Sequence, residues 1–85
     1  MENSIRVYIG IVSYNSSEDL LQCLQSLEQQ TITDFEVYIL DNASSDQTIS
    51  LLRKYTGLPI HLIINDNNVG FARAHNQIIS HCRLD

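Results

Sequence analysis

The sequence predicts an α/β module built on a three-stranded parallel sheet. Three apolar segments rich in β-branched and aromatic residues alternate along the chain with three amphipathic segments, in the order βαβαβα. Strands that alternate with helices are joined by right-handed crossovers, which makes neighbouring strands parallel. Successive strands of this kind most simply form a sheet of order 3-2-1, the first half of a doubly wound, three-layer, Rossmann-like fold.

The strands are expected at residues 5–12, 35–40 and 60–64. The second and third are nearly continuous apolar runs rather than alternating ones. This pattern is typical of strands that are covered on both faces, as in a parallel sheet.

The helices are expected at residues 18–29, 46–55 and 71–82. In the first, leucines recur at spacings of three and four, which is the pattern of one buried face. Ser16 and Asp19 have a capping-box-like spacing at the start of that helix. Ser44 or Ser45 is the expected cap of the second helix.

The first strand would be central in a complete doubly wound fold, but here it is expected at the edge of the sheet. An unpaired edge invites pairing with another chain. We therefore expect residues 1–85 to form a single module, half of a larger domain, that self-associates through the edge of its first strand. For the same reason, part of the Phe71, Ile78 and Ile79 face should remain exposed.

Composition excludes several classes of protein. Ten Asp and Glu against five Lys and Arg give a net charge of −5, which opposes nucleic-acid binding, because phosphate contacts need clustered basic side chains. No apolar run approaches the roughly 18 residues of a membrane span, and the first residues lack the basic segment of a secretory signal. A cytoplasmic location is therefore expected. Cys23 and Cys82 form no CxxC pair and are expected to be buried, reduced thiols.

Motifs for common cofactors are missing. The three glycines, Gly10, Gly57 and Gly70, form neither GxGxxG nor GxxxxGK, which excludes a dinucleotide fingerprint and an ATP-binding P-loop. The His and Cys positions do not suggest a metal cluster.

Polar loops follow all three predicted strands, at residues 13–18, 41–46 and 65–70. Ligands of open parallel sheets bind beyond the carboxyl ends of the strands. Ser, Asn and Asp are ordinary turn residues, but three such loops at one end of a sheet favour a binding site.

Three charged residues near these loops have two interpretations each. Asp41 could hydrogen-bond a ribose or the N3–H of uracil or thymine, or it could form a turn. Glu18 either complements the helix dipole or makes a second ribose contact. Arg73 is either the cation that a diphosphate needs or an ordinary surface arginine.

The same loops resemble those of family 2 glycosyltransferases. The matching segments are VSYN at 12–15, LDNASSD at 40–46 and NVGFARAHN at 68–76, in the order and spacing of that family's amino-terminal half. The segment DNASSD is most similar to the sequences of the bacterial rhamnosyltransferase-like branch. The resemblance implies a GT-A type fold and a hexosyltransferase of polysaccharide biosynthesis. Such an enzyme transfers a sugar, with inversion, from a nucleotide donor to a saccharide or lipid-linked acceptor, in the cytoplasm or at the inner membrane surface.

The resemblance also implies nucleotide-binding roles for ten residues. Those that would border the nucleoside are Ser13, Tyr14, Asn15 and Glu18. Asp41 would bind the base or ribose, with Ser44 and Asp46 supporting its loop. Those on the donor side would be Gly70, which permits close approach, together with Arg73 and Asn76. The donor nucleotide is left open among UDP, dTDP and GDP.

This sequence departs from the family's pattern in one large respect. In such enzymes a metal-binding DxD motif follows a fourth strand, and a later carboxylate deprotonates the acceptor. Neither has a counterpart here, so we expect no catalytic residue and no metal ligand among these residues, and little or no transferase activity from them alone. Mg²⁺ or Mn²⁺ is expected for the complete enzyme. Two alternatives are a stand-alone nucleotide-binding module and a small α/β interaction domain without catalysis.

Overall fold

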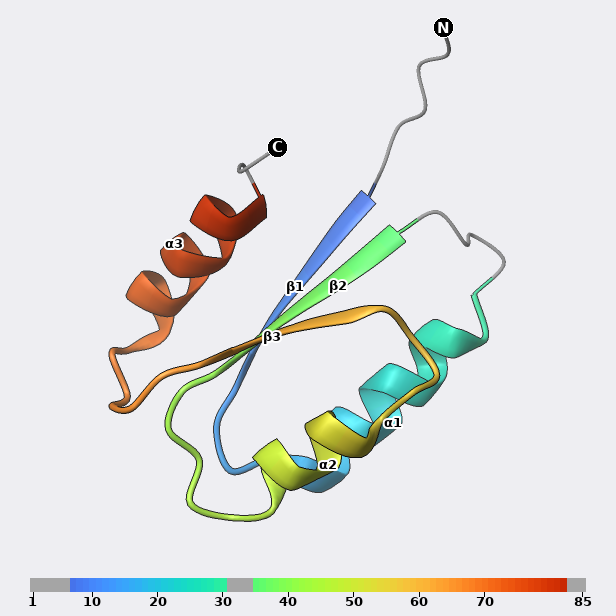
Figure 1. Cartoon of the computed structure of the whole chain (residues 1–85), viewed down its shortest axis with the longest axis horizontal. Coiled ribbons are helices and arrows are strands. Elements are labelled where there is room, and N and C mark those ends of the chain that lie inside the picture. Colours follow the sequence, from blue (N-terminus) through green and yellow to red (C-terminus); the bar gives the residue numbers. More distant parts are fainter. Residues whose placement is uncertain (1–6, 31–34, 83–85) are drawn as a thin grey trace, which may run out of the picture.

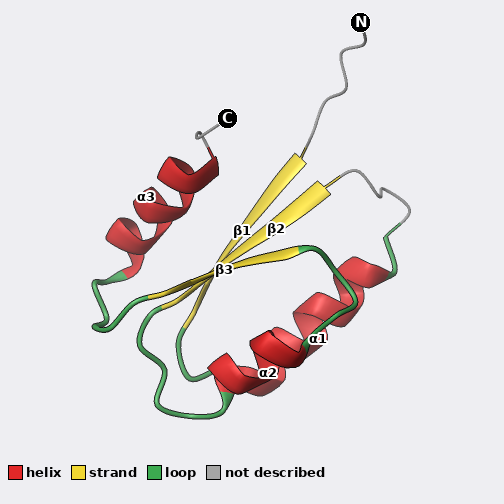
Figure 2. Ribbon diagram, in the orientation of Figure 1, coloured by secondary structure: helices red, strands yellow, loops and turns green. Residues whose placement is uncertain are grey.

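The computed structural model describes residues 7–30 and 35–82. The elements in chain order are β1 (Val7–Ser13), α1 (Ser17–Glu28), β2 (Phe35–Asp41), α2 (Thr48–Lys54), β3 (Ile60–Ile64) and α3 (Phe71–Cys82). The strands form one parallel sheet in the order β1-β2-β3, which confirms the predicted 3-2-1 arrangement. Helices α1 and α2 cover one face of the sheet and α3 covers the other, giving three layers (Figures 1 and 2).

The register of the sheet aligns the carboxyl ends of the strands. Ser13 pairs with Asp41, and Asp41 pairs with Ile64, so all three strands end at one level. The ladder continues one step beyond the predicted ends of β1 and β2, because the N–H of Asn42 donates to the Ser13 carbonyl and that of Asn65 to the Asp41 carbonyl, both at 2.9 Å. The loops that follow the strands therefore start side by side.

Each face of the sheet has its own core. On one face, α1 and α2 pack on β2 through a buried cluster of Leu20, Leu24, Val37, Ile39 and Leu52. On the other face, Leu40 packs against Ala74 and Ile78 of α3. Complete burial of one such aliphatic side chain contributes about 1.5–3 kcal/mol. The two cores together fix α1, α2 and α3 against the sheet.

The predicted helix caps are only partly right. Ser16 is the N-cap residue of α1, but its side chain makes no cap hydrogen bond. Helix α2 begins at Thr48, two residues later than expected, and its N-cap is Gln47 rather than Ser44 or Ser45. The reason is that Ser44 and its neighbours bond to the loop after β1, so they do not cap the helix.

The thiol prediction is only half right. Cys23 and Cys82 are both free, but Cys23 is exposed and Cys82 is half-buried. Burial in α1 is confined to Leu20 and Leu24, which leaves Cys23 on the solvent side of that stripe.

The outer surfaces of β1 and α3 are partly uncovered. Within the described residues β1 pairs with β2 alone. Phe71 is 70% and Ile79 51% exposed, as expected, whereas Ile78 is buried in the core.

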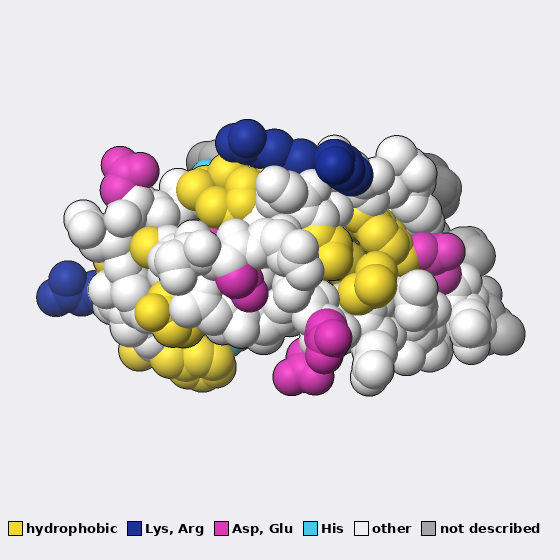
Figure 3. All heavy atoms as spheres, turned by 90° about the horizontal axis from the view of Figure 1, so that it is seen from below, with side chains coloured by type: hydrophobic (Ala, Val, Ile, Leu, Met, Phe, Trp, Pro, Cys, Tyr) yellow, Lys and Arg dark blue, Asp and Glu magenta, His cyan; other side chains and the backbone are white. Residues whose placement is uncertain are grey.

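On the molecular face seen in Figure 3, acidic side chains lie scattered among apolar and neutral ones, and basic side chains lie at the margin. None of the helices in the described part has the length and apolar character needed to cross a membrane.

Candidate functional site

The loops after β1, β2 and β3 meet at one end of the sheet (Figure 1). We call this surface the strand-end rim, made of residues 13–18, 41–48 and 65–73. Side chains of each loop bond to another loop or to an adjacent strand end, as the following distances show. The rim is therefore a cross-linked surface rather than three independent turns.

Asp41 is the centre of the rim. It is fully buried, and its Oδ1 accepts hydrogen bonds from Ser13 Oγ at 3.0 Å and from Ser44 Oγ at 2.6 Å. Its Oδ2 accepts the Ser44 N–H at 2.9 Å. A carboxyl group removed from water needs such partners, and bonds to a carboxylate are the strong ones. Asp41 thereby fastens the end of β1 to the loop between β2 and α2.

Asn15 makes a second link between the same two loops. Its N–H donates to Ser44 Oγ at 2.9 Å, and its Oδ1 accepts the N–H of Ser45 at 2.8 Å and of Asp46 at 3.3 Å. Asn15 has a φ of 47°, a conformation that asparagine tolerates, whereas Ala43 nearby has a φ of 67°. A left-handed alanine is strained, so the surrounding bonds must hold the loop in place.

Asp46 lies at the entrance to α2. Its Oδ1 accepts hydrogen bonds from the N–H of Thr48 at 2.9 Å and from Thr48 Oγ1 at 2.5 Å. These two bonds lower the pKa of Asp46 below its ordinary value of 3.8. Because Asp46 is exposed while Thr48 is buried, the carboxylate ties the loop to a fixed point in the core.

The third loop is held by residues that the sequence analysis did not single out. Asn42 is 3% exposed, and its side chain bonds to the loop before α3. Asn65 and Gln77 form a reciprocal amide pair, at 2.9 and 3.2 Å, between the end of β3 and α3. The only available signal was a polar residue directly after each strand, which does not distinguish a buried amide from an ordinary turn residue.

The other predicted site residues surround this cross-linked centre. Tyr14 is 51% exposed. Arg73 and Asn76 are exposed on the first two turns of α3. Gly70 has a φ of 87°, and apart from its chain neighbours no described residue has an atom within 4 Å of the position that a Cβ would take. The space beside this glycine is therefore open to a ligand.

Glu18 lies on a different side of the rim. It lines a hollow of about 290 Å³ between the start of α1 and the loop before α2, together with Asn15, Ser16, Ser17, Asp19 and Gln47. The structure therefore gathers Ser13, Asn15, Asp41, Ser44 and Asp46 into one network. It places Glu18 at the α1 edge of that network and Arg73 with Asn76 on α3.

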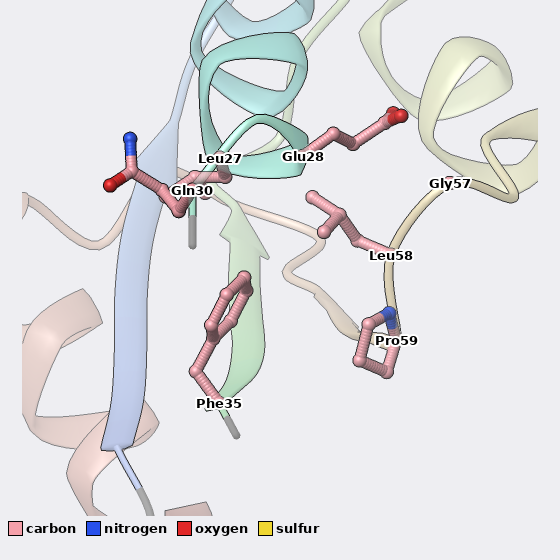
Figure 4. Close-up of a pocket in the computed structure, with 7 residues that line it drawn as sticks. All are labelled: Leu27, Glu28, Gln30, Phe35, Gly57, Leu58 and Pro59. Carbon is pink, nitrogen blue, oxygen red and sulfur yellow. The ribbon is translucent and has the colours of Figure 1, made fainter. Parts of the chain in front are cut away.

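A second hollow of about 260 Å³ lies at the opposite end of the sheet. Figure 4 shows its lining residues, from the end of α1, the start of β2 and the loop before β3. The Glu28 carboxylate lies against Gly57, where any Cβ would collide with it. This hollow is remote from the carboxyl ends of the strands and lacks the polar network, so it is not part of the candidate site.

The rim does not fit a divalent metal ion. Residues 7–30 and 35–82 contain no group of three His, Cys, Asp or Glu side chains that could hold one. The Asp41 carboxyl group is enclosed by its three donors, and the Asp46 Oδ1 is occupied by Thr48. These groups bind the protein's own loops, and we derive no metal-dependent step from them.

Comparison with known proteins establishes the family. Residues 8–85 match the family described as "Glycosyl transferase family 2". The chain is 38% identical over 78 residues to a chondroitin synthase of Escherichia coli, covering 91% of this chain and 11% of that protein. It is 35% identical over 75 residues to a hyaluronan synthase of Pasteurella multocida, covering 87% and 8%. The chain belongs to glycosyl transferase family 2.

A solved structure supports the same conclusion about the fold. The mannosyltransferase PcManGT from Pyrobaculum calidifontis, determined in complex with GDP-mannose and Mn²⁺, superimposes with a TM-score of 0.79 at 29% identity. The match covers 89% of this chain and 24% of that one, and the predicted GT-A, Rossmann-like fold is confirmed. The chain spans between about a tenth and a quarter of the length of these three proteins. The rhamnosyltransferase-like branch stays a prediction.

Proposed function

We propose that this chain is the nucleotide-binding amino-terminal half of a glycosyltransferase domain. The complete enzyme would transfer a sugar from a UDP-, dTDP- or GDP-linked donor to a saccharide or lipid-linked acceptor, with inversion. The observation that carries the proposal is the strand-end rim, where three loops are bonded into one surface at the carboxyl ends of a parallel sheet. Membership of the family and the likeness to an enzyme that binds GDP-mannose support it.

In this proposal the nucleoside lies over the rim between Tyr14 and Gly70. Gly70 presents no side chain, and the space beside it is open. The diphosphate then lies toward the amino-terminal end of α3, where the helix dipole and the exposed Arg73 favour negative charge. Asn76 lies one turn further along α3 and is exposed as well.

Asp41 contributes to this site chiefly by shaping it. The carboxylate has one unused acceptor position, because Oδ2 receives a single bond from Ser44. Asp41 is fully enclosed, however, so a base N–H reaches Oδ2 only when one of the adjoining loops moves aside. Selection among uracil, thymine and guanine would then depend on how far that loop opens.

The chemical step is proposed to require residues beyond those described here. Transfer with inversion needs a base that removes the acceptor proton and a charge partner for the leaving diphosphate. A divalent cation would supply that charge in the complete enzyme. We accordingly propose that the 85 residues bind nucleotide without transferring sugar, and that the complete enzyme works in the cytoplasm or at the inner membrane surface.

The edge of β1 is proposed to pair with a second copy of the chain. Proteins protect an edge strand from pairing by placing charged residues or proline in it. Residues 7–13 contain neither. Size-exclusion chromatography with light scattering should show a dimer or larger species, and Tyr8→Lys should shift it toward monomer. A monomer at high concentration would contradict this proposal.

The binding proposal is tested by calorimetric titration with UDP, dTDP and GDP. Arg73→Ala should weaken binding by roughly 10- to 150-fold, because a charge-assisted bond to a phosphate contributes about 1.5–3 kcal/mol. Arg53→Ala is the matched control, since Arg53 is also exposed but lies in the last turn of α2. A folded chain that binds none of the three nucleotides would refute the proposal and favour an interaction domain.

A further inference from the structure

Asn42 connects the end of β2 to the loop before α3 through a buried side-chain amide. Its Oδ1 accepts the Val69 N–H at 3.0 Å and the Asn65 Nδ2 at 3.4 Å, and its Nδ2 donates to the Gly70 carbonyl at 3.4 Å. The backbone N–H of Asn42 also donates to the Ser13 carbonyl at 2.9 Å. One residue thus contacts the ends of β1 and β3 and the chain leading into α3.

One of the atoms that Asn42 binds in that chain, the Gly70 carbonyl oxygen, is also the first acceptor of α3. The Gly70 carbonyl accepts the Ala74 N–H at 3.2 Å, which is the first hydrogen bond of the helix. The Gly70 N–H donates to Asn68 Oδ1 at 2.9 Å, and the residue has a φ of 87°. The turn at Gly70 is therefore fixed by Asn42 from the inside and by Asn68 from the outside.

Asp41 and Asn42 divide the rim between them. The carboxylate of Asp41 binds Ser13 and Ser44, whereas the amide of Asn42 binds the loop at residues 65–70. These two adjacent side chains, both at most 3% exposed, link all three strand-end loops. A buried amide whose oxygen and nitrogen both have partners favours one geometry, because losing either bond would be costly.

We propose that Asn42 is a positioning residue for nucleotide binding. It does not touch the ligand. It holds Gly70 and the first turn of α3 in place, so that Arg73 faces the nucleotide that Tyr14 and Gly70 would border. The inference rests on the proposed function, and it adds a third buried polar residue to a site that already contains Ser13 and Asp41.

The test compares Asn42→Ala with Gln25→Ala by nucleotide titration of the ¹⁵N-labelled chain with UDP and GDP, at a temperature where both variants are folded. Gln25 carries an exposed side-chain amide on α1, outside the strand-end rim, which makes it the control. If the loss of Asn42 lowers the competent loop population to about a tenth, the apparent affinity falls about tenfold. Gln25→Ala should bind like the unaltered chain.

The amide spectra separate positioning from simple destabilisation. Without nucleotide, Asn42→Ala should shift the amide signals of Val69, Gly70 and Ala74 and leave that of Thr48 in place. Unchanged affinity in a folded Asn42→Ala variant would overturn the inference. If the unaltered chain itself does not bind nucleotide, the proposed function is overturned instead.

A second variant covers the case in which Asn42→Ala does not fold. Asn68→Ala removes only the exposed bond to the Gly70 N–H. Weaker nucleotide binding than in Gln25→Ala would support the inference, because the turn at Gly70 has been loosened. Equal binding by Asn68→Ala and Gln25→Ala would overturn it.

Discussion

Ser44→Ala is the substitution that most directly probes the rim. The Ser44 hydroxyl donates to Asp41 Oδ1 at 2.6 Å and accepts the Asn15 N–H at 2.9 Å. Removing it takes one of three donors from a buried carboxylate, and bonds to charged groups contribute about 1.5–3 kcal/mol. The exposed Asn15 N–H can bind water instead and adds little. We expect the free energy of unfolding to fall by about 2–3 kcal/mol, or roughly 10–20 °C in Tm for a chain of this size.

The assay is urea and thermal unfolding followed by far-ultraviolet circular dichroism. Ser45→Ala is the matched control, because Ser45 is the next residue, is exposed, and contributes its backbone N–H rather than its hydroxyl to the bond with Asn15. Its free energy of unfolding should change by less than about 0.5 kcal/mol. Equal stability of the two variants would refute the claim that Ser44 and Asp41 hold the rim together.

Three other measurements examine separate features. Gly70→Ala should destabilise the chain by about 1–2 kcal/mol because of the positive φ, whereas Ala43→Gly should stabilise it by up to about 1 kcal/mol in thermal unfolding; the opposite signs would contradict the backbone geometry. The lowered pKa of Asp46 makes its contribution to stability complete above its unfolded pKa, and that contribution is lost as pH falls through the lower folded pKa. Asp46→Asn should therefore flatten the pH dependence of unfolding below about pH 4, and an unchanged slope would be inconsistent with the Thr48 bonds. Burial, and then the charge of Glu36, raises the pKa of Cys82, so iodoacetamide should alkylate the exposed Cys23 first. Mass spectrometry of single-cysteine variants measures the two rates, and faster reaction at Cys82 would contradict its placement.

The elements could be predicted because their signals are local. Continuous β-branched runs and the leucine repeat of α1 depend on neighbouring residues only, and all six elements occur within a few residues of the expected positions. The cap of α2 could not be predicted, because Ser44 bonds to Asn15, 29 positions away. No local pattern indicates such a partner, and a serine before a helix looks the same in both cases.

The location of the candidate site could be predicted from the sequence, but its internal hydrogen bonds could not. The rule that ligands bind at the carboxyl ends of parallel strands, together with the three loop motifs, identified the rim. The enclosure of Asp41 depends on the register of the sheet, which places Ser13 beside it. The burial of Asn42, at 3% exposed, depends on its bonds to Gly70 and Val69, 27–28 positions away. Long-range pairing, rather than residue type, decides which polar side chains of the rim face a ligand.

The central claim is that the strand-end rim binds a nucleoside diphosphate. Its most direct test is to map the backbone amide shifts of the ¹⁵N-labelled chain during titration with UDP, dTDP and GDP. We expect saturable shifts at Tyr14, Gly70 and Arg73, with the amide signal of Gly57 at the other end of the sheet unmoved. A well-dispersed spectrum with no shifts, or with shifts centred on the hollow beside Gly57, would contradict it.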